Sequence, residues 1–328
     1  MTQTADPRTN PFLIYRPIDD PDAQDKPHDY ENPLRVFYEE IAPPLFPRPK
    51  ATRTPEAPVR TVGWEPSQGM KGARTSTFVP LPLPGTTPVT EGMARVAKGT
   101  EGMNTMINLI VDTSGSMGAT AATFNGYSYG RWEVARICAA IMIEMAKRGD
   151  DYFGMFSFNT RGKTEWPAPA LDHDDCIDWM LSYYPGGTGG MGIQVPFSPG
   201  GGTDISSGMR ECIRAMKTKK MDKAVTVIIC DMYASDGSYF YDAAMASDGF
   251  GGTCDATLRK YGPVFYIAIG SESESDYMDA AQEAFSVRMD GVVGHKIFPR
   301  PGISCALGEG VGGAITLGGT LARIAGMV

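Results

Sequence analysis

Three short segments of the chain combine carboxylate and hydroxyl side chains in a pattern that could bind a metal ion. The first is Asp112-Thr113-Ser114-Gly115-Ser116, a D-x-S-x-S sequence. The second is Gly201-Gly202-Thr203-Asp204, and the third begins at Asp231. Residues two apart in an extended turn can point the same way, so the first segment could present one carboxylate and two hydroxyls to a common point.

Oxygen ligands of low total charge suit hard cations, so these segments favour Mg²⁺, with Mn²⁺ or Ca²⁺ as alternatives. A D-x-S-x-S sequence alone is weak support, because Asp, Ser and Gly are also ordinary turn residues. Ser114, Ser116 and Thr203 could instead cap helices, and Asp204 is interpreted as the N-cap of the helix that follows it.

Two of these segments are predicted to follow buried strands directly. The β-branched run Ile107–Val111 ends at Asp112, and the most apolar run of the chain, Ala224–Cys230, ends at Asp231. Both patterns are typical of strands buried on two faces. Further strands are predicted at 152–158, at 263–269 and, as an edge strand, at His295–Phe298. Helices are predicted at 132–148, from about 204, at 274–285 and at 317–324.

Strands that alternate with helices predict an α/β fold, with a doubly wound, mostly parallel sheet flanked by helices. In such sheets the binding residues gather in the loops at the carboxyl ends of the strands. We therefore expect the three segments to lie at one edge of the sheet. Three longer loops, at 118–130, 182–202 and 233–254, are expected near the same edge.

This combination resembles the von Willebrand factor type A (vWA) domain, a Rossmann-like fold, and its metal-ion-dependent adhesion site (MIDAS). The resemblance covers about 103–328 in element order. It implies a metal site in which the D-x-S-x-S loop supplies two serine hydroxyls directly and its aspartate mostly through water. A threonine from a second loop completes the shell, an aspartate from a third loop closes it, and one position is left for a partner's carboxylate. The implied site residues are Asp112, Ser114, Ser116, Thr203 and Asp231.

The third segment departs from the family pattern. Family members commonly place a glycine after the third aspartate, whereas here four residues separate Asp231 from Asp236-Gly237. Asp231 is preferred because it ends its strand directly, as Asp112 does. Asp236 stays the alternative ligand.

The prolines divide the chain. Of its 25 prolines, 17 lie within residues 1–100, which carry 12 basic and 12 acidic residues. The net charge of −8 therefore belongs to the remainder. We expect an extended, proline-rich arm at 1–102, with at most two helical turns near 34–41, and one vWA-like domain at 103–328. The arm's aromatic residues indicate that it lies along another surface.

Composition excludes several classes of protein. No apolar run approaches the roughly 20 residues that cross a bilayer, and the first ten residues are polar, so we expect a cytoplasmic location or a particle assembled in the cytoplasm, such as a virion. An acidic domain without basic runs argues against nucleic-acid binding. The six cysteines lack a CxxC pair and are expected to be free and buried.

The sequence contains none of the common nucleophile-elbow, phosphate-loop or dinucleotide-binding motifs, so a non-enzymatic function is expected. The first hypothesis is a structural protein of a large complex, possibly phage-like, whose metal site binds a partner's carboxylate while the arm binds neighbouring subunits. The alternatives are an adaptor of a AAA+ ATPase of the MoxR or chelatase kind, and a metal-dependent hydrolase.

Overall fold

The computed structural model divides the chain into two compact units, residues 50–103 and the remainder. The residues that the structure describes are 33–45, 60–66, 76–78, 93–98, 105–124, 127–181, 197, 199–231, 234–294, 297, 300–308 and 312–325.

A six-stranded sheet forms the centre of the larger unit, in the spatial order β11-β10-β9-β4-β7-β8. All neighbouring pairs are parallel except β7 and β8. Counted along the chain, this is the 3-2-1-4-5-6 order of a doubly wound sheet, which confirms the predicted fold class. The strands are β4 (Thr105–Asp112), β7 (Tyr152–Phe158), β8 (Gly162–Ala170), β9 (Lys223–Cys230), β10 (Val264–Ser271) and β11 (Gly302–Leu307).

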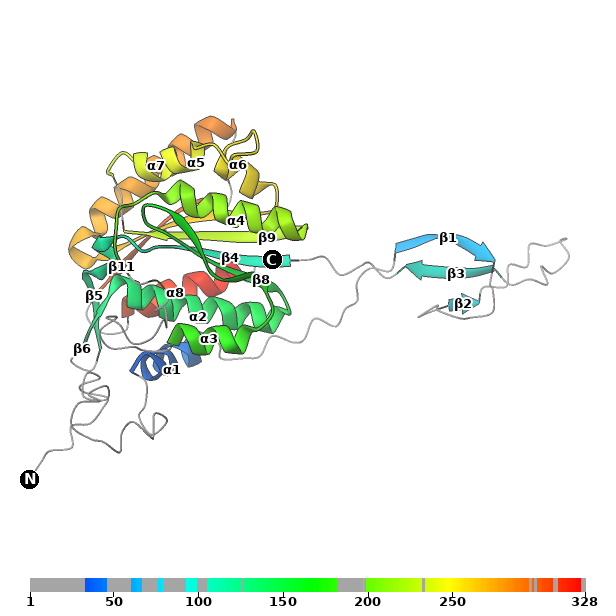
Figure 1. Ribbon diagram of the computed structural model, residues 1–328, viewed down its shortest axis with the longest axis horizontal. Coiled ribbons are helices and arrows are strands. Elements are labelled where there is room, and N and C mark those ends of the chain that lie inside the picture. The colour runs from blue at the N-terminus through cyan, green and yellow to red at the C-terminus, as the bar shows by residue number, and fades with distance from the viewer. Residues whose placement is uncertain are drawn as a thin grey trace, which may run out of the picture. The chain divides into compact units, whose positions relative to one another are not determined.

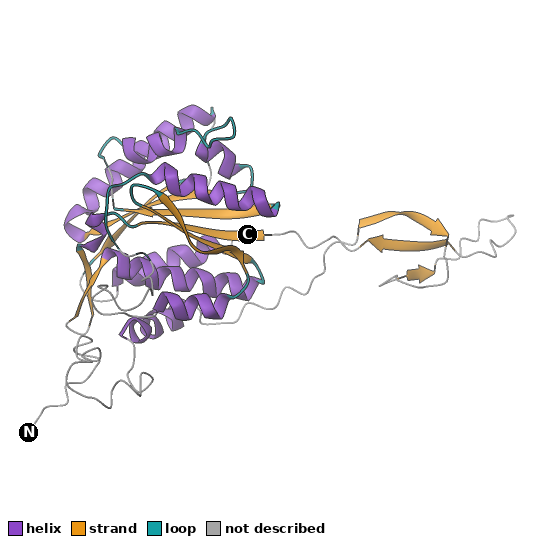
Figure 2. Ribbon diagram, in the orientation of Figure 1, coloured by secondary structure: helices purple, strands orange, loops and turns teal. Residues whose placement is uncertain are grey.

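Helices cover both faces of this sheet (Figures 1 and 2). One face carries α1 (Pro33–Leu45), α2 (Arg131–Gly149), α3 (His173–Leu181) and α8 (Gly312–Ala325). The other carries α4 (Ile205–Lys219), α5 (Ser238–Met245), α6 (Cys254–Arg259) and α7 (Ser275–Val293). Among the helices of the described residues, none is both long enough and apolar enough to cross a membrane.

Two hydrophobic cores lie on the two faces of the sheet. Alternate side chains of β4 belong to one core or the other. Ile107, Leu109 and Val111 belong to the core under α2, whereas Met106 and Ile110 belong to the core under α4. Successive side chains of a strand point to opposite faces, so a strand covered on both faces must be apolar throughout. This explains why the short run before Asp112 is almost continuously apolar.

The long predicted elements agree with the structure. The strands at 107–111, 152–158, 224–230 and 263–269 correspond to β4, β7, β9 and β10, with small changes at their ends. The predicted helices correspond to α2, α4, α7 and α8. The stop predicted at Gly149 is confirmed, since α2 ends there and Asp150 adopts a left-handed conformation. All six cysteines are free and buried, as expected.

The predicted edge strand at His295–Phe298 is wrong where the structure describes it. Ile297 is not in a strand, and its neighbours in that segment lie outside the described residues. The edge strand is instead β11, whose residues pair in parallel with β10 from Gly302↔Tyr266 onward. β11 has only six residues and no sustained alternation, so its sequence gives little strand signal, which is why it escaped prediction.

Two of the expected long loops contain regular structure. The hairpin β5 (Thr120–Phe124) and β6 (Tyr127–Gly130) occupies the first, together with the end of a 3₁₀ helix, η2 (Gly115–Gly118). The third contains α5 and its whole connection to α6. Most of the loop at 182–202 lies outside the described residues.

Within the predicted arm, the structure describes one helix and three strands. Helix α1 belongs to the larger unit, where Leu34, Phe37 and Ile41 are fully buried. It continues through Pro43 to Leu45, beyond the two turns expected. The smaller unit contains a sheet in the order β1-β3-β2, with both pairs antiparallel. Its strands are β1 (Arg60–Pro66), β2 (Ser76–Phe78) and β3 (Met93–Lys98). The predicted boundary after residue 102 stays a prediction.

Candidate metal site

The candidate site lies at the carboxyl ends of β4 and β9, the two adjacent strands between which the sheet order reverses. Their register pairs Val111 with Ile229, which sets Asp112 level with Cys230 and leaves Asp231 one residue beyond. Ligands of doubly wound sheets bind at this switch point, outside the strand ends. The fold therefore brings two acidic residues, 119 positions apart in sequence, to the place where this architecture binds ligands.

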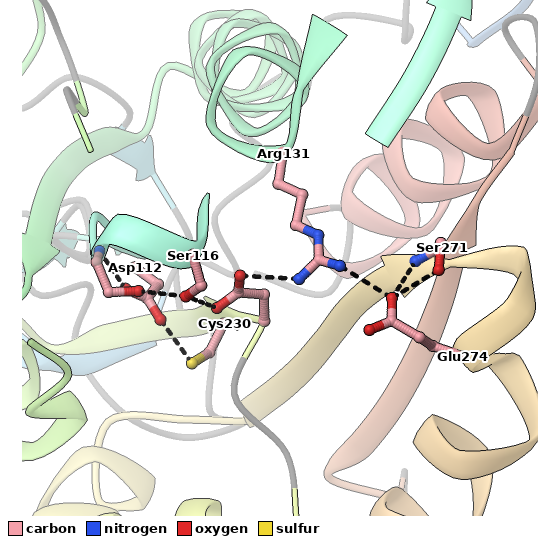
Figure 3. A network of polar contacts seen from close by, with 8 residues as sticks. Asp112, Ser116, Arg131, Cys230, Ser271 and Glu274 are labelled. Atoms are coloured by element: carbon pink, nitrogen blue, oxygen red, sulfur yellow. Dashed lines mark hydrogen bonds and ion pairs between the residues drawn. The ribbon is translucent and has the colours of Figure 1, made fainter. Parts of the chain in front are cut away.

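A chain of polar contacts joins the first and third predicted segments (Figure 3). Within the first, the Ser114 backbone N–H donates to Asp112 Oδ1 at 2.6 Å, which closes a tight turn. The hydroxyls of Ser114 and Ser116 lie 2.9 Å apart. Ser116 Oγ then donates to Asp231 Oδ1, also at 2.9 Å.

These distances are those of hydrogen bonds, and they also equal the spacing of neighbouring ligands on an octahedral cation. Ligands of Mg²⁺ bind at 2.0–2.1 Å, so two neighbouring ligands of one ion are about 2.9 Å apart. The pairs Ser114–Ser116 and Ser116–Asp231 both show this spacing between oxygens. Neither serine caps η2, since Ser114 precedes it without a capping hydrogen bond from its side chain and Ser116 lies inside it. The donor set therefore fits a hard divalent ion.

Burial dominates the electrostatics of Asp112, whose side chain has no exposed surface. The loss of water raises the pKa of its carboxyl to about 6, against opposing hydrogen bonds from Cys230 and Ser114. Cys230 Sγ donates to Asp112 Oδ2 at 2.8 Å. A ligand atom from each of Asp112, Cys230 and Asp231 lies within 4.8 Å of the others, so a thiolate is a further possible ligand for a softer metal.

Arg131, the first residue of α2, also reaches this site. Its Nη1 donates to Asp231 Oδ2 and its Nη2 to Glu274 Oε2, both at 2.9 Å. The same Glu274 oxygen accepts the backbone N–H and the hydroxyl of Ser271, each at 2.7 Å. Figure 3 shows the resulting line of contacts from Asp112 through Arg131 to Glu274.

The second predicted segment lies beside the first, joined to it through the backbone. Gly200 N–H donates to Thr113 O at 2.7 Å, and Gly115 N–H to Gly201 O at 3.3 Å. Thr203 lines an open pocket of about 230 Å³ together with Tyr239 and Asp242. Its role as a metal ligand stays a prediction.

Two acidic residues near the site have other partners. Asp204 accepts the backbone N–H of Ser207 at 3.2 Å, which confirms it as the N-cap of α4. Asp236 is exposed, accepts the N–H of Ser238 at 3.0 Å and pairs with Arg288 at 3.3 Å. Of the two predicted alternatives in the third segment, Asp231 is the one that contacts Ser116.

Sequence reasoning missed Arg131 and Glu274. One signal was available for Arg131, because a cation in the first turn of a helix faces the positive end of the helix dipole. Such a local inconsistency is expected at functional sites. Glu274 gave no comparable signal, since acidic residues are common at helix starts.

No family model and no curated protein sequence matches this chain. Among solved structures, it is similar to a von Willebrand factor type A protein from Catenulispora acidiphila, with 11% identity, coverage of 68% of this chain and 43% of that chain, and a TM-score of 0.42. It is also similar to the conserved hypothetical protein BatB from Bacteroides thetaiotaomicron, with 13% identity, coverage of 67% of this chain and 98% of that chain, and a TM-score of 0.41.

The PilB minor pilin from Streptococcus sanguinis gives 14% identity, coverage of 74% of this chain and 66% of that chain, and a TM-score of 0.40. The chain thus spans 64% to 66% of the length of two PilB structures. Similarities of this size carry no conclusion about function. The fold assignment rests on the strand order of this chain, and the function must come from its site.

Proposed function

We propose that this domain is a protein-binding module whose contact with its partner depends on a divalent cation, Mg²⁺ first and Mn²⁺ or Ca²⁺ as alternatives. The residues proposed to hold the ion are Asp112, Ser114, Ser116, Thr203 and Asp231. The observation that carries this proposal is the row of three oxygens, from Ser114 through Ser116 to Asp231, at the spacing of an octahedral ion and at the switch point of the sheet.

The composition of the row favours binding over catalysis. The two serine hydroxyls are neutral, and the charge of Asp231 is shared with Arg131. A cation held by such a set keeps much of its attraction for an incoming anion. A carboxylate side chain supplied by a partner protein is therefore the proposed contact.

The wider role that we propose is that of a non-enzymatic structural component of a large complex, in the cytoplasm or in a particle assembled there. The near-neutral, proline-rich segment before the domain supports this proposal, because its residues 50–103 form a separate unit that offers additional surface for neighbouring subunits. The adaptor and hydrolase alternatives stay predictions.

The test of the site is calorimetric titration of Mg²⁺ into the purified chain, alongside thermal unfolding with Mg²⁺ and with EDTA. We expect saturable binding and a rise in Tm with Mg²⁺. Ser116→Ala and Asp231→Asn should remove both, because each deletes one oxygen of the row. Asp236→Asn is the matched control, since its carboxylate is exposed and pairs with Arg288 instead.

Loss of Mg²⁺ binding in Asp236→Asn but not in Asp231→Asn would overturn the assignment of the third ligand. An unchanged Tm and no heat of binding in the wild type would overturn the metal site altogether. Partner binding is then tested by cross-linking the native complex with and without EDTA. Cross-links from this edge of the sheet that persist in EDTA would refute a metal-dependent contact.

A further inference from the structure

The side chain of Arg131 is held in place far more firmly than a surface arginine. Only 11% of it is exposed, and the side chain of its partner Asp231 has no exposed surface. The second partner, Glu274, is fixed in turn by Ser271. The buried Nε of Arg131 has no hydrogen-bond acceptor among the described residues. The arginine is thus positioned by its two carboxylates.

The position of Arg131 in its helix is electrostatically unfavourable. It is the first residue of α2, where the helix dipole favours anions. Its backbone is fixed there by the N–H bond to Ala119 O at 2.9 Å, and the preceding Gly130 N–H is capped by Glu133 at 2.8 Å. Ion pairing with Asp231 and Glu274 offsets the cost of placing a cation at this end of the helix.

The charges around the site indicate what the arginine does. Asp112, Asp231 and Glu274 contribute three negative charges when ionised, and Arg131 contributes one positive charge. The group therefore has a net charge of −2, which one divalent cation neutralises. Without the arginine, the buried Asp231 would have no cationic partner whenever the metal is absent, and an unpaired buried charge is strongly destabilising.

We propose that Arg131 is a positioning residue that stands in for the metal, neutralising Asp231 and holding its Oδ1 toward Ser116 so that the empty site stays folded. This inference rests on the proposed metal site. In the metal-bound protein the same ion pair is retained, because the guanidinium contacts Oδ2, whereas Oδ1 contacts the hydroxyl of Ser116, itself a proposed ligand. The arginine thereby lowers the affinity of the site for the metal ion. It also stabilises the metal-free state, so that the ion can bind and leave reversibly.

The experiment compares Arg131→Met with the wild type in thermal unfolding, with EDTA and with Mg²⁺ at constant ionic strength. In EDTA we expect the variant's Tm to fall by about 6 to 20 °C, the size expected for breaking a largely buried ion pair in a domain of this length. With saturating Mg²⁺ the difference should shrink, so that Mg²⁺ raises the variant's Tm by more than it raises that of the wild type.

Arg148→Met is the control, because Arg148 lies on the same helix and pairs with Glu144, away from the site. It should change neither Tm nor the Mg²⁺ shift. Arg131→Lys keeps a positive charge but not the two-armed contact, and should fall between the wild type and Arg131→Met. If Arg131→Met does not fold, the same comparison is made with Arg131→Lys.

Equal losses of Tm in EDTA and in Mg²⁺ would show that Arg131 is only structural and would overturn this inference. No loss in either condition would overturn it as well. Both results leave the proposed function intact, as long as the wild type binds Mg²⁺. A wild type that does not respond to Mg²⁺ overturns the proposed function first, and this inference with it.

Discussion

Burial and hydrogen bonding act in opposite directions on the carboxylates of this domain, and Asp112 and Asp248 show the two outcomes. Asp112 is enclosed where few groups solvate its charge, so its pKa is raised to about 6. Asp248 is also buried, but its carboxylate accepts the N–H groups of Phe250 and Gly252 and the hydroxyl of Thr257. These bonds lower the pKa of Asp248 to about 2. In Asp112 burial outweighs the hydrogen bonds, whereas in Asp248 the hydrogen bonds outweigh burial and fix a loop.

Asp248 gives a pH-dependent prediction. Because its pKa falls from an ordinary 3.8 to about 2 on folding, the unfolded chain binds this proton more readily. Its stabilisation is therefore complete above pH 3.8 and is lost as the pH falls through about 2. Asp248→Asn should lower Tm at pH 6, and the difference from the wild type should shrink toward pH 2.5.

Thermal unfolding in EDTA across this pH range measures the effect of Asp248→Asn. The exposed Asp242 provides the control variant, Asp242→Asn, which should follow the wild type at every pH. If the difference in Tm between Asp248→Asn and the wild type stays constant down to pH 2.5, the ionised carboxylate of Asp248 is not the cause of the stabilisation.

Residues that follow a buried strand could be predicted from the sequence, and residues that act through distant pairs could not. Asp112, Ser114 and Ser116 were recognisable because an apolar run ends directly before hydroxyls at alternate positions. The contact of Arg131 with Asp231 joins residues 100 positions apart, and that with Glu274 joins residues 143 apart. No local pattern specifies such pairs, since they depend on how α2 and α7 approach the sheet.

At the scale of elements, α1 is the part of the chain whose environment differs most from the expectation for the arm. Leu34, Phe37 and Ile41 recur at helical spacing and are fully buried in the core under α2. The ring of Phe37 stacks on Tyr129, with centroids 4.5 Å apart and planes at 21°. A helix of 13 residues is marginal alone, so this packing must supply its stability.

Phe37→Ala should therefore release α1. Removing a fully buried phenylalanine costs about 3 to 5 kcal/mol, which exceeds what a short docked helix can lose and stay docked. Hydrogen exchange of the α1 amides should accelerate on the order of a hundredfold, while that of β4 and β9 amides should change little. Glu39→Ala, an exposed position on the same helix, is the control, and equal protection in both variants would contradict the docking role of Phe37.

The helices and strands differ in how clearly their sequence patterns predict them. The helix α2 and the strand β9 have long periodic or apolar patterns, and both were predicted. The strand β8 contains two prolines and pairs only along one edge, with register shifts against β7, so its sequence is typical of a loop. The short α5 and α6 gain their stability from packing around Phe240 and Leu258 rather than from local pattern.

At the scale of the whole molecule, the two compact units do not coincide with the arm and the domain that the sequence predicted. Helix α1 packs with the domain, and residues 50–103, which lie between α1 and β4 in the sequence, form a unit of their own. If the smaller unit is independent of the domain's stability, its surface is available for neighbouring subunits, as the assembly proposal requires. This independence can be tested directly.

Replacing residues 50–103 with a flexible Gly/Ser linker of about 20 residues should leave the domain folded and its response to Mg²⁺ unchanged. Shortening the connection between α1 and β4 lowers the entropy cost of closing that loop, by about 1 kcal/mol at most, so urea unfolding should show equal or slightly greater stability. Deleting 1–49 as well should lower stability, because it removes the buried side chains of α1. A marked loss of stability from the linker replacement alone would mean that the smaller unit packs on the domain, and would remove it as free surface for assembly.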